Sequence, residues 1–168
     1  IHKLSGDIPY FIQKICKYCG IYAVEKNRRH IGYPELETVI RILTCEEKNV
    51  DKDSLVRNLS DNEFQNNQYS PGNPKSVHAV ISSIAYINDG SINPRGVSMI
   101  ELQQLWSEKH IDAFRPLLAD AINLLLEKRI LTVEDDEDIP VYKISVDLFR
   151  RWWSANHKDI NLELSAIK

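Results

Sequence analysis

Cys16 and Cys19 are separated by two residues, and this CxxC spacing is the first feature of the chain that could do chemistry. Paired thiolates can hold zinc, which needs four ligands in a tetrahedral site. No second cysteine pair or nearby histidine completes the set, and both cysteines fall on the apolar face of a predicted helix. We therefore expect both to pack in the core and predict no metal site, with a metal on the two thiols as the alternative. Five further candidate ligands are scattered without metal-site spacing: His2, His30, His78, His110 and His157.

The sequence shows no catalytic constellation. Serine, histidine and aspartate are all present, but there is no nucleophile elbow. The chain also lacks a glycine-rich loop ending in Gly-Lys-Ser/Thr, whose amides and lysine surround a phosphate chain. No strand is followed by the paired acids that would hold magnesium. We expect no enzymatic activity and no bound cofactor in this chain.

Basic and amide side chains gather in and after a predicted helix at 111–128. If this helix entered a major groove, four residues could contact bases and phosphates: Arg115, Asn123, Lys128 and Arg129. Acidic residues oppose this, because five consecutive acids at 134–138 would face the DNA polyanion. We therefore favour packing against a protein partner and keep DNA binding as the alternative.

The C-terminal stretch LFRRWW places two arginines beside two tryptophans. The helical spacing predicts that one tryptophan enters the core and that its neighbour is pushed toward the edge. An edge Trp153 beside Arg150 and Arg151 would be a contact for a partner. Plain core packing with a solvated basic side is the alternative that the pattern favours.

The composition of the chain excludes some classes of function. The 168 residues are 43% hydrophobic and 27% charged, with a formal charge of -3 and a pI near 6.0, so the chain as a whole does not attract nucleic acid or acidic membranes. No run approaches a membrane span, no signal peptide is seen, and three cysteines suit a reducing compartment. We expect a cytoplasmic protein without membrane contact. The start at Ile1, in mid-pattern and without methionine, predicts a piece of a longer protein.

Two helices are predicted in the first part of the chain. The first begins near Asp7, and Gly32 with Pro34 closes the segment after it. Its apolar residues fall at helical spacing at Phe11, Ile12, Ile15, Cys16, Cys19, Tyr22 and Ala23, and those of the second helix at Leu36, Val39, Ile40 and Leu43. The region 51–74 combines a weak helical pattern with a dense loop signal. We place a domain junction there, dividing the chain into a helical segment with linker, 1–73, and a second domain, 74–168.

The order of elements after the loop is informative. We predict a helix at 75–88, a turn at 91–96, a short helix from Ser98 to Trp106 with Glu101 completing a capping box, and a helix at 111–128 that Pro116 could kink. Strands at 130–133 and 141–145 flank an acidic turn, and a last helix spans 147–157. Three helices and a hairpin are the order of a winged helix-turn-helix with a two-stranded wing. The expected fold class is mainly α.

Both parts of the chain resemble one protein family. SGDIPYFIQKIC resembles the lid helix of AAA+ and STAND-type ATPases of bacteria and archaea. GVSMIELQQLW, the helix ending LLLEKRIL and the closing VYKISVDLFRRWW resemble the winged-helix domain that follows the lid in the same proteins. The two resemblances cover most of the chain and agree in order and spacing.

The resemblance implies a C-terminal portion that lacks the catalytic core. Gly6 and Pro9 would then lie near the adenine of ATP or ADP in the intact protein, although Asp7 stands where the family often has a second glycine. The implied function is non-catalytic regulation, in which nucleotide state is coupled to contacts with the ATPase core, a protein partner or an oligomer neighbour. A winged-helix DNA-binding module remains the alternative.

Overall fold

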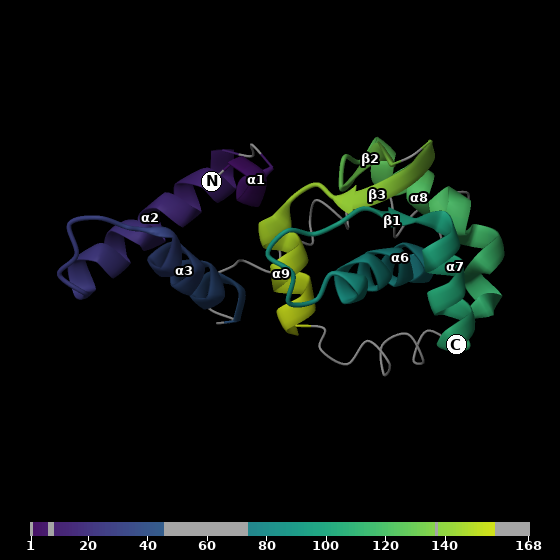
Figure 1. Cartoon of the computed structure of the whole chain (residues 1–168), viewed down its shortest axis with the longest axis horizontal. Helices are drawn as coiled ribbons and strands as arrows, with labels where there is room; N and C mark the ends of the chain where they lie inside the picture. Colours follow the sequence, from purple (N-terminus) through teal and green to yellow (C-terminus); the bar gives the residue numbers. More distant parts are fainter. Residues whose placement is uncertain (1, 7–8, 46–73, 137, 157–168) are drawn as a thin grey trace.

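The computed structural model describes residues 2–6, 9–45, 74–136 and 138–156. The first part contains α1 (His2–Ser5), α2 (Pro9–Glu25) and α3 (Tyr33–Cys45), of which the short α1 was not predicted. Figure 1 shows α2 and α3 as a hairpin of two helices at one end of the molecule. The two predicted helices are confirmed, with Phe11 and Ile15 of α2 buried against Val39, Ile40 and Leu43 of α3.

The second part begins with α6 (Pro74–Ile87), a short strand β1 (Val97–Ser98) and α7 (Met99–Glu108). A 3-10 helix, η1 (Asp112–Leu117), then leads into α8 (Leu118–Glu127). Strands β2 (Leu131–Asp136) and β3 (Ile139–Ile144) form a hairpin, and α9 (Asp147–Asn156) follows. The predicted capping box is confirmed, because the Ser98 hydroxyl accepts from the Glu101 amide while the Glu101 carboxylate accepts from the Ser98 amide.

The strands form a three-stranded antiparallel sheet in the order β1-β3-β2. Val97 pairs with Tyr142, and Leu131 pairs with Ile144. The predicted two-stranded sheet was therefore incomplete, because β1 adds a third strand. A Cβ on Gly96 would collide with Val141, so the absence of a side chain there lets β1 approach β3 closely.

Two predicted elements are corrected in this region. The expected helix at 111–128 is divided into η1 and α8, because Pro116 lies in its first half and has no amide hydrogen for an α-helical hydrogen bond. The predicted acidic turn is shorter than expected. Three of its acids, Glu134, Asp135 and Asp136, pair along β2 with residues of β3. The predicted short helix in the region 51–74 and the domain junction lie outside the described residues, since 46–73 are not described.

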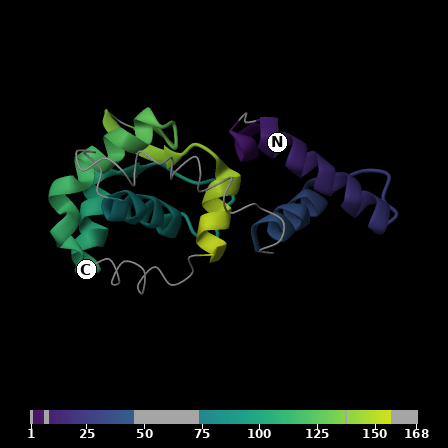
Figure 2. The ribbon, with the colours of Figure 1, turned by 180° about the vertical axis from the view of Figure 1, so that it is seen from behind.

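One hydrophobic core extends through both parts of the molecule. Seen from behind in Figure 2, α9 stands between the α1–α3 helices and the remainder of the second part. Its contacts with α1, α3, α6 and β3 agree with that position. The chain is thus mainly helical with a small sheet, and α9 is the element that connects its two ends.

Candidate functional site

Helix α9 has a buried apolar side and a polar side that is buried at Asp147 and Arg150 and half-buried at Arg151. Leu148, Phe149, Trp152 and Trp153 enter the core, as the helical spacing of the sequence requires. The polar side begins with Asp147 in the first turn, where a carboxylate is favoured by the partial positive charge of the helix N-terminus. This arrangement places a charged cluster against neighbouring helices.

Asp147 holds two consecutive arginines through its two carboxylate oxygens. Arg150 Nε donates to Oδ1 at 2.7 Å, and Arg151 Nε donates to Oδ2 at 2.7 Å. The arginines are three and four residues after Asp147, the spacings that place side chains next to one another on a helix. Because Arg150 and Arg151 are adjacent in sequence, their guanidinium groups bind the same carboxylate but also reach different neighbouring elements.

Arg150 faces α6 and the loop that follows it. Its Nη1 donates to the Asn88 carbonyl and its Nη2 to the Ser91 carbonyl, both at 2.7 Å. The residue is only 2% exposed, so these acceptors replace water around the charge. A cation at the carbonyl end of α6 also satisfies acceptors that have no helical partner. Arg150 therefore fixes the end of α6 to α9.

Arg151 faces the other way, toward α3. Its Nη1 donates to Glu37 Oε2 at 2.6 Å. Burial alone would lower the pKa of the Arg151 guanidinium, but its bonds and attraction to Glu37 and Asp147 raise it, so the charge is retained. Desolvation and a hydrogen bond to the Glu37 carboxylate raise the pKa of the Tyr33 hydroxyl. Glu37 thus interacts both with Tyr33 of its own helix and with Arg151 of α9.

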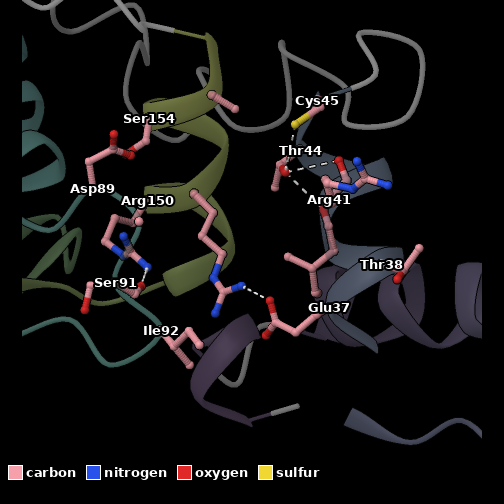
Figure 3. Close-up of a pocket in the computed structure, with 14 residues that line it drawn as sticks. Glu37, Thr38, Arg41, Thr44, Cys45, Asp89, Ser91, Ile92, Arg150 and Ser154 are labelled. Atoms are coloured by element: carbon pink, nitrogen blue, oxygen red, sulfur yellow. Dashed lines mark hydrogen bonds and ion pairs between the residues drawn. The ribbon is translucent and has the colours of Figure 1, made fainter. Parts of the chain in front are cut away.

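A second polar contact joins the far ends of the same helices. Asn156 Nδ2 donates to the Thr44 carbonyl at 3.0 Å, near the end of α3. Between the two contacts lies a cleft of about 800 Å³, bounded by α3, α9 and residues 89–92. Figure 3 shows Arg150 near Ser91 on one side of α9, whereas Glu37 and Thr44 approach from the other. The α3–α9 contact therefore has polar bonds at both ends of an open cleft, beside the hydrophobic core that the two helices share.

The turn before α2 also touches the start of α9. Gly6 has a φ of +57°, and a Cβ there would lie 2.7 Å from Val146 Cγ2 and 3.2 Å from the Ser145 carbonyl oxygen. A side chain would be opposed by both the backbone conformation and the available space. Pro9 is exposed at the first position of α2. The structure therefore gives Gly6 a contact within the chain that the sequence did not suggest.

The residues predicted for nucleic-acid contact are spread over several elements. Arg115 on η1 is exposed and donates to Gln103 Oε1 at 3.4 Å. Asn123 is exposed on α8 between the equally exposed Asp120 and Glu127. After the helix, Lys128 is half-buried and Arg129 is exposed in the left-handed region, with a φ of 57°. Along its exposed side, α8 itself carries more acidic than basic groups.

The expectation of an edge tryptophan is wrong. Trp152 and Trp153 are each 5% exposed, and the Trp153 indole donates to Ser82 Oγ at 3.0 Å. The expected solvated basic side is wrong too, because Arg150 is buried and Arg151 is half-buried. Both sides of α9 can be covered because α6 packs on one and α3 on the other. Sequence reasoning missed Glu37, Thr44, Ser82, Asp147 and Asn156, and only Asp147 had a readable signal, its helical spacing to the arginines.

The expected burial of both cysteines is corrected for Cys16. Cys16 is exposed, whereas Cys19 packs partly against the core. Each residue turns a helix by about 100°, so the position after the fully buried Ile15 points well away from the core. Partial burial and the neighbouring Cys16 raise the pKa of the Cys19 thiol. Among the described residues, no three histidine, cysteine or acidic side chains group as metal ligands would.

Comparison with known proteins gave no match to a family model, a curated protein or a solved structure. Within the described part of the chain, no helix is both long enough and apolar enough to span a bilayer.

Proposed function

We propose that the chain is the non-catalytic C-terminal region of an AAA+/STAND-like ATPase, and that it couples nucleotide state to partner or oligomer contacts. In this proposal, 1–73 is a lid-like helical segment and 74–168 is a winged-helix domain. The helices α6, α7 and α8 would be the helical core of that domain, and β2 and β3 its wing. The order of elements and the β1-β3-β2 sheet support this assignment.

The observation that carries the proposal is the ion pair between Glu37 of α3 and Arg151 of α9. It joins the two proposed units across 114 positions of sequence, and Asn156 adds one hydrogen bond to Thr44. A half-buried ion pair and a hydrogen bond can exchange with water at modest cost. Because α3 and α9 also share the hydrophobic core, a second arrangement would have to keep them packed while these polar contacts exchange. Such a contact suits a lid that takes up two arrangements.

Arg150 attaches α9 to the proposed winged-helix domain. Three hydrogen bonds from its buried guanidinium join α9 to Asp147 and to the end of α6. A movement of α3 would therefore shift the lid relative to α9 before it detached α9 from α6. Gly6 supplies a second contact, through which the turn before α2 would press on Val146 at the start of α9.

ATP or ADP would be held by the core of the parent protein, with the exposed Pro9 near the adenine. The nucleotide would favour one lid position, and α9 would pass this preference to the winged-helix surface. Coupling of this kind requires two arrangements that bind the partner with different affinity.

The test uses the protein together with its natural upstream sequence. We expect a Gly-Lys-Ser/Thr phosphate loop one nucleotide-binding domain before Ile1. Small-angle scattering should then give different shapes with ATP and with ADP. Identical shapes in the two states, or an upstream sequence without the phosphate loop, would contradict the proposal. The DNA-binding alternative is weakened by the acids on α8 and β2. Its signature would be duplex binding by the parent chain that weakens steeply with salt and is reduced in Arg115→Ala, Lys128→Ala or Arg129→Ala.

A further inference from the structure

Two exposed surfaces have no role in the α3–α9 contact, and each combines apolar side chains with an excess of one charge, although the exposed Glu25 lies among the cations of the first. We define the basic end as Ile21, Val24, Lys26, Arg28 and Arg29, at the end of α2 and in the turn after it. We define the acidic edge as Val133, Asp135, Asp136, Asp138 and Ile139, on the β2–β3 hairpin.

The apolar members are among the exposed large hydrophobic side chains of the described residues. Val24 is 83% exposed and Ile21 41%, while Val133 is 51% and Ile139 48% exposed. Covering such side chains contributes roughly 25 cal/mol per Å² of apolar area. Apolar side chains surrounded by charge are typical of protein interaction surfaces.

Both surfaces are held in a defined conformation. Asn27, with a φ of 49°, closes α2, and backbone hydrogen bonds from Asn27 to Val24 and from Arg28 to Ala23 fix the turn that presents the cations. The acidic edge is fixed by strand pairing, in which Asp135 is opposite Pro140 and Asp136 is opposite Ile139. In the described sheet, the outer side of β2 has no neighbouring strand.

The two surfaces carry opposite charges. Among the ion pairs of the described residues, none involves a cation of the basic end or an aspartate of the acidic edge, and Lys143 instead pairs with Glu134. Figure 1 places the end of α2 at one end of the molecule and the β2–β3 hairpin on the other part, beyond α9, and Figure 2 agrees. The two surfaces therefore cannot meet within one chain.

We propose that the acidic edge of one copy docks on the basic end of a second copy, so that the chain assembles head to tail. The match consists of three aspartates against three cations, with two exposed aliphatic side chains on each surface. Because the two surfaces differ, the assembly keeps one unused surface at each of its ends, and the contact can repeat. This inference is independent of nucleotide coupling.

Sedimentation velocity on the 168-residue chain tests the proposal. At about 50 mM salt we expect concentration-dependent growth in mass as the protein approaches about 1 mM, the range of weak complexes. Raising the salt to about 500 mM should increase the dissociation constant about tenfold or more, because exposed charges are then screened. A chain that stays monomeric throughout at low salt would overturn the proposal.

Charge reversal identifies the surfaces. One variant reverses the basic end, Lys26→Glu/Arg28→Glu/Arg29→Glu, and the other reverses the acidic edge, Asp135→Lys/Asp136→Lys/Asp138→Lys. Each alone should lose self-association at least about tenfold. An equimolar mixture should recover it, because the unaltered acidic edge of the first variant meets the unaltered basic end of the second. A control with an equal charge change elsewhere, Lys17→Glu/Arg41→Glu/Arg115→Glu, should associate like the parent chain.

The same variants distinguish the head-to-tail contact from other partners of the two surfaces. If the basic end serves DNA, the parent chain shifts a duplex at low salt, its Lys26→Glu/Arg28→Glu/Arg29→Glu variant does not, and mixing the two reversed variants yields no larger species. A mixture that stays monomeric while circular dichroism shows both variants folded overturns the head-to-tail contact. A control variant that fails to associate would overturn it too, since net charge and not the two surfaces would then govern assembly.

Discussion

Replacing Arg150 by methionine removes the buried cation while keeping a side chain of similar length. The structure gives this residue three hydrogen bonds at 2.7 Å, to Asp147, Asn88 and Ser91, at 2% exposure. Breaking a buried ion pair costs about 3–5 kcal/mol, because the partner charge and the carbonyls lose their donors. Asp147 keeps Arg151 as a partner, so we expect the lower end, about 3 kcal/mol.

Urea unfolding followed by circular dichroism measures this loss. With an m-value of about 1–3 kcal/mol/M, the unfolding midpoint should fall by roughly 1–3 M while m stays constant. Arg150→Lys should recover only part of the stability, because one ammonium group cannot serve three acceptors in the geometry of a guanidinium. Arg115→Met is the exposed control and should change stability by less than about 0.5 kcal/mol. A loss below about 1 kcal/mol for Arg150→Met would refute the role assigned to this cluster.

Three further changes test other contacts. A double-mutant cycle of Glu37→Gln and Arg151→Gln in urea unfolding should give a coupling of about 1 kcal/mol, and additive effects would show that the ion pair does not join α3 to α9. Gly6→Ala should destabilise by about 1–2 kcal/mol because of its left-handed backbone and the contact with Val146, and an unchanged thermal midpoint would contradict that contact. Burial opposes ionisation of Glu101, but bonds from Ser98 and Arg95 outweigh it and lower its pKa from 4.5. The stabilisation that the ionised Glu101 provides should be complete above about pH 4.5 and be lost as the pH falls through the lowered pKa. The stability of the parent chain should therefore fall more steeply in this range than that of Glu101→Gln. Parallel stability curves for the two proteins would refute the role of Glu101.

Local features were predictable because they depend on near neighbours in sequence. Helical spacing predicted α2, α3, α6 and α9, and the Ser98 to Glu101 spacing predicted the capping box. Pro116 was recognised as a possible kink, but sequence alone did not show that it would mark a change from 3-10 to α-helix. Strand pairing extended β2 through residues whose acidic composition is typical of a turn.

Only part of the candidate site could be predicted from the sequence. Asp147, Arg150 and Arg151 are grouped by helical spacing, which requires no long-range information. Their partners Glu37 and Ser91 come from distant segments, and their positions depend on how α3 and α6 pack against α9. The same packing buried both tryptophans, whereas a helix considered alone has one side that faces water.

The exposure of Cys16 could not be predicted from the spacing of apolar residues alone. Apolar residues spaced by three and four do not all share one narrow stripe, and the position directly after Ile15 turns away from α3. Only the packing of α2 identified which residues of the broad apolar side were covered.

The proposed coupling requires α3 to change its position on α9 with the nucleotide state of the proposed parent protein. The direct measurement is the distance between spin labels at Arg41 of α3 and Asn123 of α8, both exposed, in the protein that carries its upstream nucleotide core. Cys16, Cys19 and Cys45 would first be replaced by serine so that only the two labels react. We predict two distance populations whose proportions differ between ATP and ADP and shift further in Arg151→Gln. One distance, unchanged by nucleotide and by this substitution, would contradict the account.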